Sequence, residues 1–221
     1  MSRQIVINFH GIGAPPAAIE DDERPYWVDI DMFTKIVERA APRPEVSFTF
    51  DDGNRSDLEQ AAPLLARLGR TGEFFVLTGR LDRAGYLTPA DLHALRDMGM
   101  GIGLHGRDHV DWRRLDEAAL AAETIEARNT LSQAAGCPID TVSVPFGAYN
   151  RSLIKHLFSC GYAAINTSDG GTTDTTASIR NRTSVRCDMS PETIDAIIAG
   201  RSAPAAALRR TLSTFARRHL V

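Results

Sequence analysis

The chain has 221 residues, of which 43% are hydrophobic and 24% are charged, and its formal net charge is −3. These values are typical of one globular domain, and they exclude a disordered, a fibrous or a strongly basic nucleic-acid-binding protein. The three cysteines are odd in number and far apart, so they predict neither a disulfide framework nor a thiolate metal site.

Short β-rich runs alternate with helical stretches along residues 1–200. One helix has a clear start signal, because Thr88 can cap it, Pro89 fits its first position and Asp91 can complete a capping box. In chain order we expect a strand at Ile5–Phe9, a strand at Val46–Asp51, a helix at Ser56–Leu68, a strand at Glu73–Leu77, a helix from Pro89 that ends at Gly99, a strand at Gly101–His105, a helix at Leu115–Ala135, a strand at Thr141–Pro145, a helix at Asn150–Ser159, a strand at Tyr162–Asn166, a strand at Thr183–Arg186 and a helix at Pro191–Ala199.

The repeated strand–helix units predict an α/β domain with a largely parallel sheet. Roughly six to eight strands in a chain of this length fit a closed or nearly closed barrel better than an open sheet. Because residues 1–200 show no internal repeat and no low-complexity linker, we expect them to form a single domain.

Two adjacent carboxylates, Asp51 and Asp52, end the second predicted strand and are followed by Gly53. Like charges so close together repel, and a bound cation is the usual remedy. In parallel α/β folds, moreover, functional sites assemble at the C-terminal ends of strands. A plain turn is the other interpretation, since Asp and Gly are common turn residues.

Two histidines four residues apart, His105 and His109, stand at the end of another predicted strand. Imidazoles at this spacing can face one cation. Together with an upstream carboxylate they would form an Asp-His-His set that leaves coordination positions open for water and substrate. Such a set is typical of a catalytic rather than a closed structural metal site.

A third cluster, Pro145-Phe146-Gly147, ends a further predicted strand. Proline and glycine fix a loop here, and its backbone N–H could point toward the site. An ordinary strand-to-helix turn explains the same residues equally well.

Together, the segments TFDDG (49–53), HGRDH (105–109) and PFG (145–147) resemble the polysaccharide deacetylase family, also called the NodB-homology domain or carbohydrate esterase family 4. They occur in the family's order and at similar spacing. The flanking runs 63–77 and 99–109 also look like the family. The resemblance extends over residues 1–200, and the combination of motifs is specific.

The resemblance implies a distorted (β/α) barrel of about seven strands. It implies that Asp52, His105 and His109 bind a divalent metal, which we expect to be Zn²⁺, and that Asp51 is the general base. The backbone N–H of Phe146 would help to stabilise the oxyanion.

The chain departs from the usual members at two places. Ser143 stands where they have an arginine, and no histidine follows His156 until His219, although their general acid comes from a late motif. Both departures resemble the poly-N-acetylglucosamine deacetylases, whose motif order is circularly permuted and whose acid histidine comes from the first strand. His10, at the end of the Ile5–Phe9 strand, is therefore the expected general acid; the alternative is a histidine that is only hydrogen-bonded.

Two further residues, Asp169 and Arg182, lie near the last predicted strands. Both could line the site and orient Asp51 or His10, and Arg182 could replace in space the arginine that is missing at Ser143. A plain loop role for each stays equally open.

We therefore expect a metal-dependent hydrolase that removes N-acetyl groups from an N-acetylated carbohydrate, either an exopolysaccharide or a glycan precursor, and we expect no nucleic-acid partner. One alternative is a deacylase of a small or lipid-linked amide, and another is a non-catalytic carbohydrate-binding protein of the same fold. The N-terminus does not have the pattern of a signal peptide. This favours a cytoplasmic location and the small or lipid-linked substrates.

The segment 201–221 contains five arginines and no acidic residue. Leu208, Leu212, Phe215 and Ala216 would share one face of a helix, which predicts a basic amphipathic helix. We expect it to pack on the domain; the alternative is peripheral contact with an anionic membrane.

Overall fold

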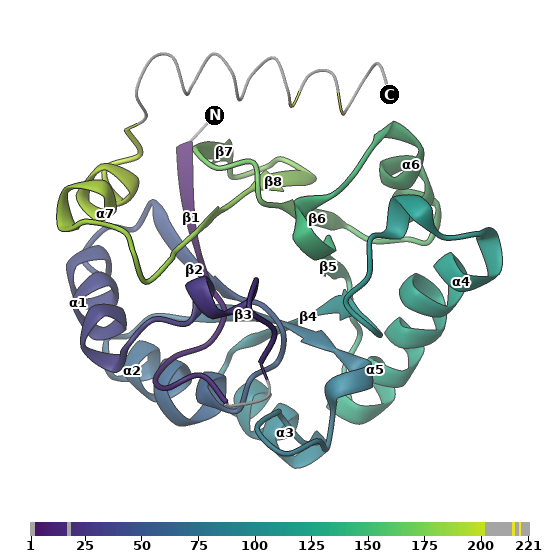
Figure 1. Cartoon of the computed structure of the whole chain (residues 1–221), viewed down its shortest axis with the longest axis horizontal. Helices are drawn as coiled ribbons and strands as arrows, with labels where there is room; N and C mark the ends of the chain where they lie inside the picture. The colour runs from purple at the N-terminus through teal and green to yellow at the C-terminus, as the bar shows by residue number, and fades with distance from the viewer. Residues whose placement is uncertain (1–2, 17–18, 202–213, 215–216, 218–221) are drawn as a thin grey trace.

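A computed structural model describes residues 3–16, 19–201, 214 and 217 (Figure 1). The predicted C-terminal helix lies outside the described residues, apart from Arg201, Thr214 and Arg217. In the part of the chain that is described, no helix is both long enough and apolar enough to cross a membrane.

A single twisted sheet forms the centre of the fold (Figure 1). Within the described residues its strands are β1 (Arg3–Phe9), β2 (Val46–Phe50), β3 (Gly72–Leu77), β4 (Gly101–Gly106), β5 (Thr141–Ser143), β6 (Ala164–Thr167), β7 (Thr172–Asp174), β8 (Ile179–Asn181) and β9 (Thr183–Ser184). The strand order is β7-β1-β2-β3-β4-β5-β6-β8, and β9 also pairs with β1. The pairing of β7 with β1 is antiparallel, whereas the other strand pairs are parallel.

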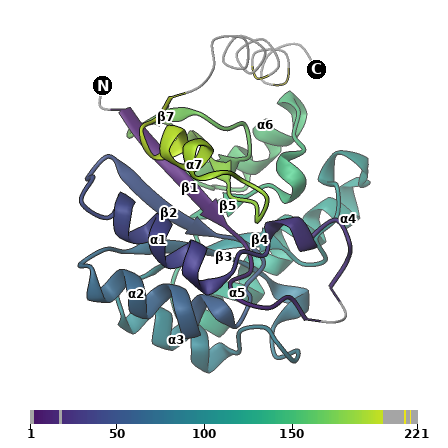
Figure 2. The same cartoon turned by 60° about the vertical axis from the view of Figure 1, so that its left-hand side comes forward.

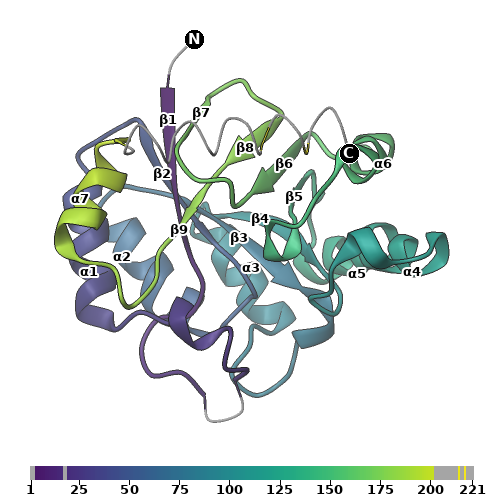
Figure 3. The same ribbon diagram turned by 45° about the horizontal axis from the view of Figure 1, so that its top comes forward.

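The segment that carries β8 and β9 closes this sheet into a barrel. β8 pairs with β6, and β9 pairs with β1 (Figure 3). Only Arg182 separates the two strands, so one short run connects β6 to β1. The predicted distorted (β/α) barrel is therefore confirmed. The short strands β7 and β8 were not predicted from the sequence.

Helices surround the outside of the barrel (Figures 1 and 2). They are α1 (Ile30–Ala40), α2 (Ala62–Arg67), α3 (Pro89–Asp97), α4 (Glu117–Ala121), α5 (Ala127–Ala135), α6 (Arg151–Ser159) and α7 (Pro191–Ile198). At α3, Thr88 and Asp91 exchange the hydrogen bonds of a capping box, which confirms that prediction. Helix α1 was not predicted, although Asp29 caps it through the Met32 N–H.

Two predicted helices are less regular than their sequences indicate. The stretches Ser56–Leu68 and Leu115–Ala135 each contain a π-helical turn, at Asp57–Ala61 and at Ala122–Glu126. In the first case Pro63 has no amide hydrogen to donate, which interrupts the usual hydrogen-bond ladder. Each turn is followed directly in the chain by an α-helix.

An apolar layer lies between the sheet and α1. Phe9, Phe50 and Phe74 are register partners on β1, β2 and β3. The Phe50 ring is stacked 5.7 Å from Phe9 and 4.5 Å from Phe74. Phe33 of α1 packs edge-on against Phe9 at 5.0 Å. These contacts fix which face of the strands points outward.

The opposite face of β1 and β2 carries polar side chains and points into the barrel. Side chains alternate along a strand, so Asn8 and Thr49, which are also register partners, point away from the phenylalanine layer. His10 and Asp51 continue the same alternation beyond the ends of β1 and β2. The sequence pattern of these two strands thus places polar groups at the mouth of the barrel.

Candidate active site

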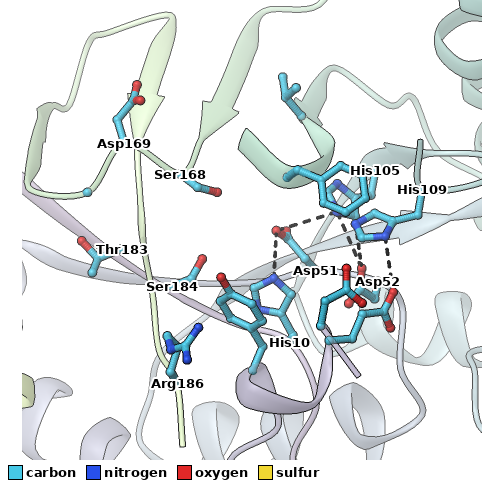
Figure 4. A pocket seen from close by; sticks show the side chains of 16 residues that line it. His10, Asp51, Asp52, His105, His109, Ser168, Asp169, Thr183, Ser184 and Arg186 are labelled. Atoms are coloured by element: carbon cyan, nitrogen blue, oxygen red, sulfur yellow. Dashed lines mark ion pairs between the residues drawn. The ribbon is translucent and has the colours of Figure 1, made fainter. Parts of the chain in front are cut away.

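The candidate site is a pocket at the C-terminal ends of the parallel strands. Its volume of about 460 Å³ is within the range of small-molecule sites. Figure 4 shows the imidazoles of His105 and His109 near Asp52, with Asp51 and His10 beside them. The fold thus brings together five predicted site residues from the ends of three strands.

Asp52, His105 and His109 have the geometry of a metal site. They offer one ligand atom each, and these atoms all lie within 4.8 Å of one another. Asp52 Oδ1 is 3.6 Å from His105 Nε2 and 3.9 Å from His109 Nε2. Two imidazole nitrogens and a carboxylate oxygen are a donor set that suits Zn²⁺.

The surroundings of these side chains also fit a cation. His105 Nδ1 lies 2.9 Å from the carbonyl oxygen of Ser143, which leaves Nε2 facing Asp52. Burial lowers the pKa of His105 from 6.5 to about 4, so its imidazole is neutral at pH 7, as metal binding requires. Asp52 Oδ1 is buried without a hydrogen-bond partner among the described residues. Such a carboxylate oxygen is costly unless a cation satisfies it.

Three non-glycine residues at this pocket have a left-handed backbone. They are Asp52 at φ 80°, His109 at φ 52° and Phe146 at φ 58°. Each such conformation costs on the order of 1–3 kcal/mol and persists only where the surroundings enforce it. Two of the three candidate ligands are therefore held in strained positions.

Arg182 holds Asp51 from inside the barrel. Its Nη1 and Nη2 atoms donate to Asp51 Oδ1 and Oδ2 at 2.7 and 2.8 Å. Nη2 also donates to Ser143 Oγ at 2.6 Å, so a guanidinium lies beside the position at which the family arginine is missing. Burial works to raise the pKa of Asp51, but the charge and hydrogen bonds of Arg182 and the two nearby histidines together outweigh it and lower the pKa. Asp51 is consequently ionised at neutral pH.

Further side chains complete the network around Asp51. Asn8 Nδ2 donates to Asp51 Oδ2 at 3.1 Å. Asn8 Oδ1 accepts from Arg182 Nη1 at 2.8 Å and from Thr49 Oγ1 at 2.7 Å. Arg182 itself is fully buried. It lies behind Asp51 and is not among the residues that line the described pocket.

His10 lies on the other side of Asp51. Its Nε2 is 4.0 Å from Asp51 Oδ2, and its ring packs 4.8 Å from the ring of Tyr26. His10 Nδ1 is buried and has no hydrogen-bond partner among the described side chains and backbone groups. The contact with Tyr26 therefore orients the imidazole toward the pocket.

The Pro145–Gly147 turn forms one wall of the pocket. Pro145 is buried, whereas the side chain of Phe146 is among the exposed hydrophobic residues, with 57% of the residue accessible. The Phe146 ring lies 4.3 Å from the ring of His109. This turn places the Phe146 ring next to one of the candidate ligands.

Asp169 belongs to the opposite wall (Figure 4). Its carboxylate accepts hydrogen bonds from the hydroxyl of Tyr149 at 2.6 Å and from Thr167 Oγ1 at 2.9 Å. It also forms an ion pair of 2.7 Å with Arg217. These contacts link Asp169 to that wall and to Arg217.

Sequence reasoning missed Glu123, which organises the loop that carries His109. This buried carboxylate accepts from the N–H groups of Arg107 at 2.7 Å and Asp108 at 3.1 Å, and from Trp112 Nε1 at 3.3 Å. No known motif spacing connects a glutamate at this position of a predicted helix with the loop that carries His109. The sequence offers only a weak signal for this role, namely one glutamate on the otherwise apolar face of a predicted helix.

Sequence reasoning also missed Glu23 and Arg80. Glu23 Oε1 lies 3.4 Å from His109 Nδ1 and 2.6 Å from Arg80 Nη2. Burial works to raise the pKa of Glu23, but the contacts with His109 and Arg80 outweigh it and lower the pKa from 4.5 to about 2. The two residues are far apart in the sequence, and no motif links them.

Comparison with known proteins agrees with this geometry. The profile described as "Polysaccharide deacetylase" matches residues 38–165, more than half of the chain. The chain belongs to the polysaccharide deacetylase family. It is 24% identical over 126 residues to the protein YxkH of Bacillus subtilis (strain 168), and the match covers 57% of this chain and 45% of YxkH. The matched part is therefore less than half the length of that curated relative.

Three solved structures share the fold of this family member. BA0330 of Bacillus anthracis superposes with a TM-score of 0.77 at 16% identity, covering 89% of this chain and 69% of that one. The Streptococcus pyogenes deacetylase PplD, solved with acetate, gives 0.72 at 19% identity, covering 89% and 98%. IcaB of Ammonifex degensii gives 0.71 at 18% identity, covering 90% and 97%.

Proposed function

We propose that the chain is a metal-dependent hydrolase that removes the N-acetyl group from an acetylated amino sugar. Membership of the polysaccharide deacetylase family supports this activity. The observation that carries the proposal is the convergence of Asp52, His105 and His109 within 4.8 Å, with Asp51 and His10 in the same pocket.

Asp52, His105 and His109 would hold the metal, and we propose Zn²⁺. A divalent ion bound there would supply Lewis-acid chemistry and lower the pKa of water toward 7 in the most favourable cases. The buried Asp52 oxygen without a hydrogen-bond partner among the described residues supports this assignment.

Asp51 is proposed as the general base. Its carboxylate is ionised and fixed by Arg182, so it can take the proton of a water that attacks the acetyl carbonyl. Asp51 Oδ2 lies 4.0 Å from His105 Nε2, which places the base beside the ligand set. General-base catalysis contributes about 10²–10⁴-fold to rates.

His10 is proposed as the general acid. An amide nitrogen is a poor leaving group unless it is protonated, and His10 Nε2 points into the pocket 4.0 Å from Asp51. The backbone N–H of Phe146 is proposed to donate a hydrogen bond to the developing oxyanion. One such donor stabilises a transition state by about 3–4 kcal/mol.

The direct test is acetate release from N-acetylglucosamine oligomers. The purified chain should release acetate, a chelator should abolish the release, and Zn²⁺ should restore it. Asp51→Asn should bind Zn²⁺ yet lose activity, because an amide cannot accept the proton. Full activity after metal removal, or in Asp51→Asn, would refute the mechanism.

The substrate itself is a separate question within this proposal. We propose an N-acetylated glycan or glycan precursor, and the size of the cavity favours recognition of a small part of it at any one time. Initial rates on monomeric, lipid-linked and polymeric acetylated sugars should differ, and the fastest class identifies the substrate.

A further inference from the structure

Glu23 and Arg80 lie against two of the three proposed metal ligands. Glu23 Oε1 is 3.4 Å from His109 Nδ1, on the side of that ring away from Asp52. Arg80 Nη2 donates to the same Glu23 oxygen at 2.6 Å, and Arg80 Nη1 is 3.9 Å from Asp52 Oδ1. The side chains of Arg80 and Glu23 are only 18% and 14% exposed. Glu23, His109, Asp52 and Arg80 thus form a mostly buried ring, in which each of the two carboxylates lies between the imidazole and the guanidinium.

The loop that carries Glu23 is attached to the barrel. The N–H of Val28 donates to the Gly11 carbonyl at 3.0 Å, and the N–H of Cys187 donates to the Pro25 carbonyl at 2.8 Å. Trp27 packs so closely on Gly11 that a Cβ there would lie 2.1 Å from the indole. These contacts flank Glu23 on its C-terminal side and hold it over the pocket.

The two candidate histidine ligands are oriented in different ways. His105 Nδ1 faces a backbone carbonyl, that of Ser143, which the strand β5 fixes. His109 lies in a loop at φ 52°, and the polar group that faces its Nδ1 is the Glu23 carboxylate. A metal-bound histidine needs a partner on its second nitrogen to fix both its tautomer and its ring orientation.

We propose that Glu23 is a positioning residue that accepts the Nδ1 proton of His109 and thereby directs His109 Nε2 toward the metal, while Arg80 holds Glu23 in place. This inference rests on the proposed metal-dependent function. A carboxylate partner also increases the basicity of an imidazole ligand, and loss of such a partner typically weakens metal binding about 10–100-fold.

The experiment compares Glu23→Gln with wild type and with Glu20→Gln. Glu20 is in the same loop and is exposed, so its variant removes the same charge without touching His109. Zn²⁺ affinity is measured by competition with a chromogenic chelator, and the ligand field is measured from the visible absorption bands of the Co²⁺-loaded protein. We expect Glu23→Gln to bind Zn²⁺ about 10–100-fold more weakly with altered Co²⁺ bands, and Glu20→Gln to match wild type.

A double variant distinguishes a positioning role of Glu23 from an effect of its negative charge alone. Glu23→Gln/Arg80→Met removes one negative and one positive charge, so the local net charge is that of wild type. If Glu23 positions His109, the double variant still binds Zn²⁺ weakly. Wild-type affinity in the double variant, or unchanged affinity and Co²⁺ bands in Glu23→Gln, would overturn the inference while leaving the proposed function intact. Absence of Zn²⁺ binding in the wild type would overturn both.

Discussion

The two sides of the pocket are built on different principles. Asp51 is held by side chains of the barrel interior, Asn8, Ser143 and Arg182, which are all buried. His109 lies in a loop and depends on two carboxylates from other segments, Glu23 and Glu123. Strand register fixes the first side, whereas individual long-range contacts fix the second.

This difference has an energetic consequence. A buried charge network contributes to folding as a unit, so damage to the Asp51 side should appear in the stability of the whole domain. A loop held by a few side chains can loosen while the barrel stays folded. Damage to the His109 side should therefore appear mainly in metal affinity.

The largest effect is expected for Arg182→Met. Loss of the guanidinium leaves the buried Asp51 carboxylate without its ion pair, which should lower the free energy of unfolding by about 3–5 kcal/mol. Urea unfolding measures this change. The double variant Arg182→Met/Asp51→Asn should recover part of the loss, because it also removes the unpaired charge. Equal stability of wild type and Arg182→Met would show that the two sides of the pocket do not differ in this way.

A large effect on activity alone is expected for His10→Gln. The variant should release acetate from N-acetylated sugars about 10²–10⁴-fold more slowly and should fold and bind Zn²⁺ like wild type. An activated aryl ester provides the control, because a phenolate leaves without protonation, so its hydrolysis should be nearly unchanged. Parallel losses on both substrates would argue against His10 as the acid.

An intermediate effect is expected for Glu123→Gln. One acceptor oxygen is replaced by an NH₂ group that faces backbone N–H donors, which should cost about 1–3 kcal/mol and weaken Zn²⁺ binding by loosening the loop that ends at His109. Chelator competition and urea unfolding measure the two changes. Glu126→Gln, at an exposed position of the same helical stretch, is the matched control and should change neither.

The smallest effect is expected for Asp57→Asn, and it is the only variant of this series that should increase the stability of the protein. Asp57 is fully buried, and neither of its carboxylate oxygens has a hydrogen-bond partner among the described residues. Burial, together with the nearby Asp52 and Asp51 charges, raises the pKa of Asp57 well above 3.8. The folded wild type therefore retains a proton that the unfolded chain releases above pH 3.8, and its stability falls as the pH rises toward the folded pKa.

Asparagine carries no proton to lose, so the advantage of the variant should grow with pH over that window. At pH 7, with chelator present, we expect Asp57→Asn to be more stable by about 1 kcal/mol, and at pH 4 the two proteins should be nearly equal. Urea unfolding at the two pH values tests this. Lower stability of the variant at pH 7 would mean that Asp57 has a stabilising partner.

Much of the fold and of the candidate ligand set could be predicted from the sequence. Asp52, His105 and Phe146 lie at or just after the ends of runs that the sequence predicts to be strands, and the C-terminal ends of parallel strands meet at one edge of a barrel. Hydrophobic periodicity did not lead us to predict α1, although Asp29, which caps this helix, is a usable signal. It also missed β7 and β8, which have three residues each and are too short to show alternation.

The sequence by itself determined the alternation of strands and helices and the chemistry at the strand ends, because hydrophobic periodicity and motif spacing are local properties. Only the tertiary structure decided which partners hold that chemistry. Arg182 is 131 positions from Asp51, and Glu23 meets His109 from a loop near the N-terminus. Such contacts follow from barrel closure and loop packing, which leave no periodic trace in the chain.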